Sequence, residues 1–160
     1  MTEFYYELLL LAGLAVIASV AGVLALYSST IMPGLKKLDD ATFVSAFKAI
    51  DRQIVKSVFM VQFFAPLFIL GGAAVYAFSQ QLDSWLLVVS ALACYFGAVA
   101  VTVGVNVPLN DGIKSVPDGI SAQDSAKARA QFNEQKWTAF NHVRTLLSIV
   151  AIVLLVIALV

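Results

Sequence analysis

The sequence predicts an all-α integral membrane protein, a bundle of four transmembrane helices with further helices at the cytoplasmic interface. The first observation is composition: 61% of the 160 residues are hydrophobic and 12% are charged, with a mean hydropathy of +0.90. A soluble domain carries about 25% charged residues. The second is charge placement, because all ten Lys and Arg residues lie in residues 36–56 and 114–144. Since basic residues gather in cytoplasmic loops, both segments are predicted to lie in the cytoplasm and both termini outside it.

Four apolar stretches are long enough to cross the membrane, since about 20 residues span roughly 30 Å of hydrocarbon. They form a single predicted domain over residues 1–160, with spans at about 6–28, 57–78, 85–107 and 139–160. The first span is predicted to stop at Met32-Pro33-Gly34, because proline cannot continue the helical hydrogen-bond ladder. The short link around Asp83 makes the second and third spans antiparallel neighbours.

The two basic segments are predicted to contain helices of their own. In the first, apolar residues recur on one helical face at Phe43, Phe47, Ile50 and Ile54. This pattern indicates an amphipathic helix along the interface, and the alternative is a plain cytoplasmic extension of the second span. In the second segment, Ser121 followed by Asp124 resembles a capping box, so a helix is predicted to begin there and to join the fourth span.

Polar side chains form stripes on the third and fourth spans. Spacings of four, three and four place Trp137, Asn141, Arg144 and Ser148 on one face of the fourth span, and Tyr95, Val99, Thr102 and Asn106 on one face of the third. The fourth-span stripe is expected to face inward against the polar set Thr102, Asn106 and Asn110, with Gln62 of the second span closing the ring. Because Arg144 falls about a turn inside the hydrocarbon, it is expected to pair with Asn106, Asn110 or an acidic partner such as Asp51.

Two interpretations of these stripes stay open. In one, the polar residues only hold the helices together, as interhelical hydrogen bonds commonly do. In the other, they line a pocket for an aromatic or lipid-like ligand, with aromatic walls from Trp137, Tyr95, Phe59 and Phe63.

Several classes of function and partner are set aside on residue types. One histidine cannot supply bis-histidine haem ligation or the histidine clusters of membrane di-iron sites, and the lone Cys94 cannot form an internal disulfide. No metal and no cofactor are predicted, with ligation by a single histidine as the alternative that stays open. A net charge of zero gives no long-range attraction for nucleic acid. Glu7 lies too near the outer end of its span to serve as the carboxylate of a proton-coupled exporter.

Small residues form stripes on the first and third spans, where they allow another helix to come close. The stripes are Ala18, Gly22, Ala25 and Ser29, and Ala93, Gly97, Ala100 and Gly104. They are expected to meet each other or a second subunit, which makes a homo-oligomer or a larger membrane complex a candidate assembly.

The third and fourth spans each carry a polar motif: Thr102-x-x-x-Asn106-Val107-Pro108-Leu109-Asn110 and Trp137-x-x-x-Asn141-His142-x-Arg144-Thr145. Taken together, the two motifs resemble those of the anthrone oxygenase-like family of small four-helix membrane proteins. The similarity extends to Met32-Pro33-Gly34-Leu35 and Ala49-Ile50-Asp51-Arg52. Most bacterial members carry only a domain-of-unknown-function label, and this chain resembles that branch, which implies the bacterial inner membrane.

The resemblance implies a chemistry. Fungal members are linked to oxidation of polyketide anthrones to anthraquinones without metal or flavin. By that analogy His142 is the catalytic base, and Arg144 and Asn141 stabilise the enolate oxygen. The residues expected to contact the substrate are Thr102, Asn106, Asn110, Trp137, Tyr95 and Gln62. The alternative function is a non-enzymatic membrane subunit or scaffold that packs against partner helices.

Overall fold

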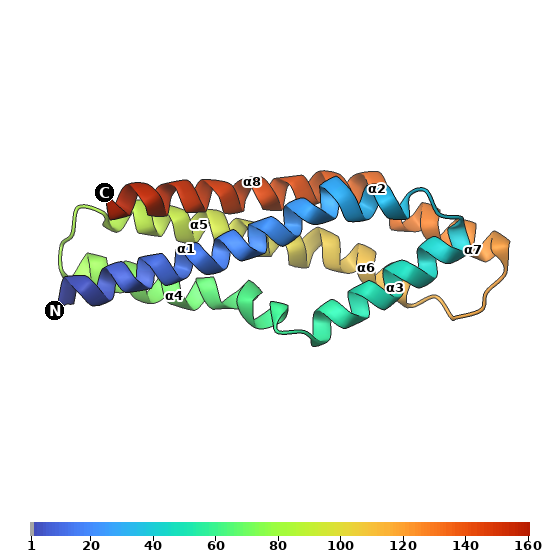
Figure 1. Cartoon of the computed structure of the whole chain (residues 1–160), viewed down its shortest axis with the longest axis horizontal. Helices are drawn as coiled ribbons and strands as arrows, with labels where there is room; N and C mark the ends of the chain where they lie inside the picture. Colours follow the sequence, from blue (N-terminus) through green and yellow to red (C-terminus); the bar gives the residue numbers. More distant parts are fainter. Residues whose placement is uncertain (1) are drawn as a thin grey trace.

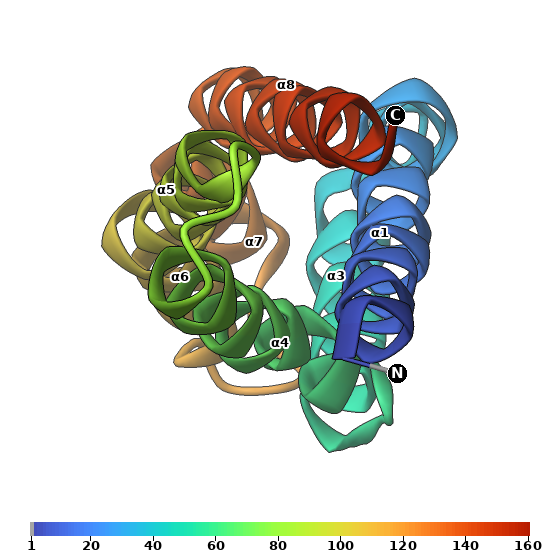
Figure 2. The same ribbon diagram turned by 90° about the vertical axis from the view of Figure 1, so that its left-hand side faces the viewer.

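The protein is an all-helical bundle, which confirms the predicted fold class. The computed structural model describes residues 2–160. The four long helices are α1 (Thr2–Leu26), α4 (Phe59–Ser79), α5 (Trp85–Val101) and α8 (Glu134–Leu159). Figure 1 shows them side by side along the molecule, with both termini at one end. Viewed from that end, α4 lies between α1 and α5, and α8 closes the ring on the other side (Figure 2).

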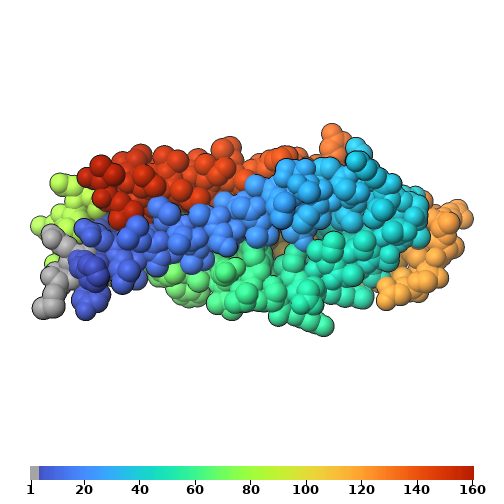
Figure 3. Space-filling view, in the orientation of Figure 1, coloured from blue at the N-terminus to red at the C-terminus, as the bar shows by residue number. Residues whose placement is uncertain are grey.

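The end of the molecule opposite the termini is built from shorter helices, and we call it the loop end. These are α2 (Met32–Leu35), α3 (Asp40–Lys56), α6 (Val107–Lys114) and α7 (Ala122–Phe132). Four helical segments, counted with the extensions that continue them, are long and apolar enough to cross a membrane: Phe4–Leu35, Phe59–Ser79, Trp85–Lys114 and Ala122–Leu159. The chain is therefore an integral membrane protein. In Figure 3 α1 covers the face between α8 and α4.

Two π-helical turns interrupt the first and third of these segments. They are η1 (Tyr27–Ile31) and η2 (Thr102–Asn106), where Met32 N–H donates to Tyr27 O and Val107 N–H donates to Thr102 O. Each turn is followed directly by a short helix with proline in its first turn, where the missing N–H costs no hydrogen bond. The first segment ends at Leu35, one residue beyond the predicted stop at Met32-Pro33-Gly34, but it passes through Pro33, so the proline is not what ends it. The third segment runs on to Lys114, beyond its predicted end near residue 107.

Helix α3 matches neither predicted alternative fully, the amphipathic helix along the interface or the extension of the second span. It runs obliquely along the long axis of the molecule (Figure 1) and packs against α6 and α7. It is also not continuous with α4, because Ser57 has an extended backbone (φ −91°, ψ 166°) and α4 begins at Phe59. Its apolar face, including Phe43 and Phe47, is buried in a second core at the loop end rather than spread on an interface.

Helix α7 begins where the capping box predicted. Ser121 Oγ accepts a hydrogen bond from Asp124 N–H (3.1 Å) and donates to the Asp124 carboxylate (2.8 Å). The helix ends at Asn133, whose backbone is left-handed (φ 53°), and α8 starts at the next residue, Glu134. The predicted junction with the fourth span therefore exists, with a sharp turn in it.

Ion pairs join the helices of the loop end. Lys48 Nζ donates to Val116 O (2.6 Å) and forms an ion pair with Asp118, so that the segment after α6 is held against α3. This hydrogen bond lowers the pKa of Asp118 below its usual value. Arg129 of α7 binds Glu134 (2.7 Å) and Asp40 (3.0 Å), which joins α7, α8 and α3.

The two small-residue stripes do not meet each other. Helix α1 packs mainly against α4 and α8, and α5 against α8 and α4. A Cβ added at Gly22 or Gly104 would find no neighbouring atom within 4 Å. Of the glycines in these stripes, Gly97 is packed, against Leu147 of α8 at 3.4 Å. The stripes therefore lie largely on the outer surface, and their predicted mutual contact is wrong.

Candidate functional site

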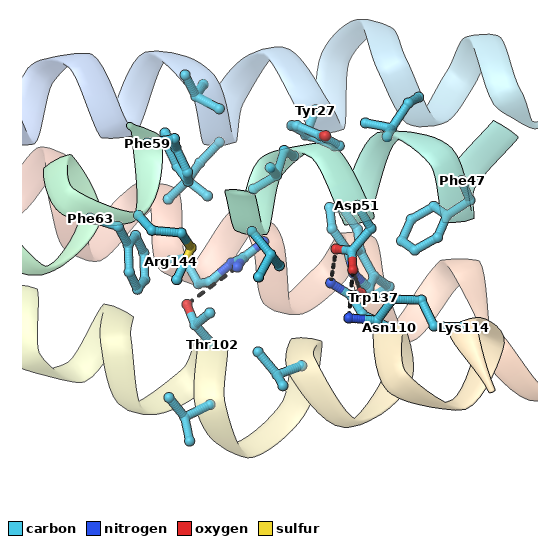
Figure 4. Close-up of a pocket in the computed structure, with 18 of the residues that line it drawn as sticks. Tyr27, Phe47, Asp51, Phe59, Phe63, Thr102, Asn110, Lys114, Trp137 and Arg144 are labelled. Atoms are coloured by element: carbon cyan, nitrogen blue, oxygen red, sulfur yellow. Dashed lines mark hydrogen bonds and ion pairs between the residues drawn. The ribbon is translucent and has the colours of Figure 1, made fainter. Parts of the chain in front are cut away.

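A cavity of about 160 Å³ lies beside the junction between α3 and α4. Its walls come from both π-turns and from α1, α2, α3, α4, α6 and α8 (Figure 4). Deviations from the regular helix are frequent at functional sites, and here both border the same space, through Tyr27 of η1 and Thr102 of η2. Most of the lining is apolar, including Leu24, Leu35, Phe47, Ile54, Phe59, Met60, Phe63 and Val103. The charged residues that line it are Asp51, Lys114 and Arg144.

Arg144 is a buried cation in the wall of this cavity. Its side chain is 6% exposed, and its guanidinium lies 5.4 Å from the centre of the Trp137 ring. Nη1 donates to Thr102 Oγ1 (3.2 Å), Nη2 donates to Asn141 Oδ1, and Nε has no hydrogen-bond partner. Among the described residues no carboxylate forms an ion pair with it. A buried guanidinium normally has an anionic partner, and Arg144 could therefore bind an anionic group of a ligand.

The partners of Arg144 agree with the prediction in part. Its inward orientation and its contact with the polar set of the third span are confirmed, the contact through Thr102, but Asn106, Asn110 and Asp51 do not bond to it. Asn141 instead presents its carbonyl to Arg144, because its amide N–H groups donate to Leu24 O (2.7 Å) and Ser28 Oγ. These bonds tie α8 to α1 and η1, which fixes the guanidinium in the cavity wall.

Asp51 forms a second polar group, toward the loop end of the cavity (Figure 4). The residue is 8% exposed, Oδ1 accepts a hydrogen bond from Asn110 Nδ2 (2.7 Å), and Oδ2 lies 2.8 Å from Lys114 Nζ. Trp137 Nε1 donates to Asn110 Oδ1 (2.7 Å). Since an indole N–H can only donate, it fixes which end of the Asn110 amide faces Asp51. Lys114 also binds Asp111 (2.9 Å), so the lysine is shared between a buried and an exposed carboxylate.

Three other residues predicted for the site do not line the cavity. Asn106 is buried and donates to Trp137 O (3.1 Å), with Oδ1 unpartnered. The Tyr95 hydroxyl donates to Phe63 O (2.8 Å) from behind the wall, so Tyr95 is not itself a wall residue. Gln62 is half-buried and is not among the lining residues, so it does not close the polar ring.

His142 does not lie in this site. Its side chain is exposed on the outer side of α8, while the neighbouring stripe residues Asn141 and Arg144 point inward. The role predicted for it as the base of this cavity therefore does not fit its position. Sequence reasoning missed Lys114 and Tyr27 as lining residues and saw Asp51 only as a partner for Arg144. The signal for Asp51 was its spacing of four residues from Phe47, which lines the same cavity.

No group of three or more His, Cys, Asp or Glu side chains within residues 2–160 is arranged to hold a metal ion. The titratable side chains of the cavity wall are thus a carboxylate, a lysine, a guanidinium and a phenol, in mainly aromatic and aliphatic surroundings.

Comparisons with known proteins give one match. The family model described as anthrone oxygenase matches residues 56–154, which contain α4, α5, η2, α6 and α7 and most of α8. No curated protein and no solved structure matches the chain. Because residues 56–154 are more than half of the sequence, the chain belongs to the anthrone oxygenase family.

Proposed function

We propose that the protein binds an acidic polycyclic aromatic of the anthrone class in this cavity and oxidises it with dioxygen, without a cofactor. The observation that carries the proposal is that a buried guanidinium with no anionic partner and a buried carboxylate line the same mainly apolar cavity. Enolising enzymes use a similar pair, in which a carboxylate takes a carbon-bound proton and a hydrogen-bond donor holds the resulting oxyanion. The family assignment supports the same reaction class.

Asp51 is the base in this proposal, and Arg144 binds the enolate oxygen. Proton removal from the ring methylene gives a carbanion whose charge is delocalised onto that oxygen. An electron pair from the carbon forms a bond to dioxygen, and the resulting peroxide anion takes up a proton. Loss of the second methylene proton then breaks the oxygen–oxygen bond. The methylene becomes a carbonyl, and the outer oxygen atom of the peroxide leaves as hydroxide and is protonated to water. The carbon loses four electrons in all, and dioxygen accepts them.

Oxygen uptake tests this proposal. Purified protein in lipid nanodiscs, treated with a metal chelator, should consume one dioxygen for each anthrone converted to anthraquinone, above the rate of the uncatalysed reaction. The control is the same lipid without protein. Uptake equal to that control across a panel of hydroxylated anthrones would contradict the enzymatic proposal and favour the non-enzymatic membrane subunit.

We also propose that both termini lie outside the cytoplasm and that the loop end lies inside, in the bacterial inner membrane. The support is the charge distribution, because none of the ten basic residues belongs to the half of the molecule that holds the termini and the α4–α5 turn. In a Cys94→Ser background, Gln80→Cys should react with an impermeant maleimide in intact cells. Gln131→Cys should react only after the cells are opened. Both glutamines are exposed, and the reverse labelling pattern would overturn the orientation.

A further inference from the structure

We infer that the cavity opens sideways into the lipid, between the α3–α4 junction on one side and η2 with α6 on the other, and that its ligand arrives from the bilayer rather than from water. The inference rests on the proposed binding site and adds the route to it and the physical class of its ligand. A molecule using this route has to be dissolved in the membrane before it is bound.

The rim of the cavity carries the first argument. Four of the residues that line the cavity are also markedly exposed, and they are Val55 (55%), Phe64 (37%), Val103 (57%) and Val107 (37%). Val55 and Phe64 lie on α3 and α4, while Val103 and Val107 lie on η2 and α6. All four are apolar. Of the charged lining residues, Asp51 and Arg144 are buried, and Lys114, whose side chain is 24% exposed, is held by Asp51 and Asp111.

The chain break at Ser57 explains why an opening exists on this side. Ser57 is extended, and its hydroxyl donates to Ile54 O (2.8 Å) and accepts from Phe59 N–H (3.2 Å), so the break is stabilised locally. The helix therefore stops at Lys56 and restarts at Phe59. The neighbouring Val58 is 71% exposed, which continues the apolar surface of the rim.

Both ends of the cavity are closed by packed side chains. Toward the termini, Leu24, Phe63, Tyr95 and Val99 belong to the main core of the bundle. Toward the loop end, the second core contains Leu35, Phe47, Phe132 and Trp137. Beyond it, Lys48 of α3 bonds to Val116 and Asp118 in the segment after α6. The apolar side opening is therefore the route that the packing leaves to a large ligand.

The volume supports the same conclusion. An apolar cavity of about 150 Å³ holds a benzene-sized ligand, and this one has about 160 Å³. A tricyclic aromatic would place its reacting end between Arg144 and Asp51 and extend through the opening. The outer part of such a ligand contacts lipid, so the site suits a hydrophobic molecule with its acidic oxygen at one end.

Quenching of tryptophan fluorescence tests the route without any turnover. The chain has two tryptophans, and Trp85→Phe leaves Trp137, which lines the cavity and is 3% exposed. In proteoliposomes, 1-bromododecane dissolved in the bilayer should quench Trp137, and iodide in the water should not. Val55→Phe with Val103→Phe fills the rim and should weaken the quenching by bromododecane severalfold. The matched control, Val75→Phe, lies on the lipid-facing side of α4 at 71% exposure and should change nothing.

Quenching by iodide, or quenching by bromododecane that is as strong in the rim variant as in the control, would overturn the side opening. Circular dichroism and thermal unfolding of the rim variant check that it is folded, and Val103→Phe alone serves if the pair is not. Because the measurement needs no substrate, absence of oxygen uptake would refute the proposed reaction and leave this result standing.

Discussion

Asp51→Asn should abolish most oxygen uptake. The substitution keeps the size of the side chain and its contact with Asn110, but it removes the group proposed to take the methylene proton. Loss of a general base typically lowers a rate by about 10²–10⁴-fold, and we expect kcat to fall in that range. The measurement is the initial rate of anthraquinone formation in nanodiscs at saturating substrate.

Asp111→Asn is the matched control, because Asp111 also binds Lys114 but is 62% exposed and does not line the cavity. It should leave kcat within a factor of about two, as surface substitutions usually have small effects. His142→Ala should also leave kcat unchanged. If His142→Ala removed the activity and Asp51→Asn did not, the base would lie on the outer side of α8 and the assignment of Asp51 would be wrong.

Arg144→Leu should remove the binding of the enolate oxygen. Deletion of one preorganised oxyanion donor costs about 10²–10³-fold in rate, and we expect a loss of this size in kcat/KM. Arg144→Lys should restore only part of it, because an ammonium cannot donate to Thr102, Asn141 and an oxyanion with the planar geometry of a guanidinium. The same variants should lose the rise in unfolding temperature that a hydroxyanthraquinone gives the parent protein.

Arg52→Leu is the control for this series. Arg52 lies on α3 with a side chain that is 51% exposed, does not line the cavity, and reaches Asp118 only at 3.8 Å. It should keep both the activity and the stabilisation by ligand. Equal ligand stabilisation in the parent and in Arg144→Leu would mean that Arg144 is a structural residue and that the cavity does not select anions.

The bundle could be predicted from the sequence because lipid imposes a simple requirement. A helix satisfies its own backbone hydrogen bonds, so the length of an apolar stretch nearly determines a span. The effect of proline on the first span could not be predicted in this way. Pro33 was interpreted as a stop, but the preceding π-turn lets the helix pass through a proline. That turn depends on packing against other helices, and a sequence pattern does not carry that information.

Much of the site was also predictable, for a related reason. Polar groups avoid lipid tails, so the stripe with Asn141 and Arg144 had to point inward. The same argument could not predict which of the inward-facing polar groups form hydrogen bonds or ion pairs with one another. Arg144 and Asp51 have opposite charges, yet they bond to different neighbours because Asp51 is positioned by α3. His142 was selected by its ordinary pKa, and its place on the outer face of α8 shows that helical position outweighs chemical suitability.

A structure of the protein in lipid with a hydroxyanthraquinone bound tests the central claim most directly. The account predicts ring density in the cavity against Trp137 and Phe59, with a ligand oxygen within hydrogen-bond distance of Arg144 and the far end in the opening beside Val103. Ligand density confined to the outer lipid-facing surface, with the cavity unchanged and Arg144 still without an anionic partner, would contradict it.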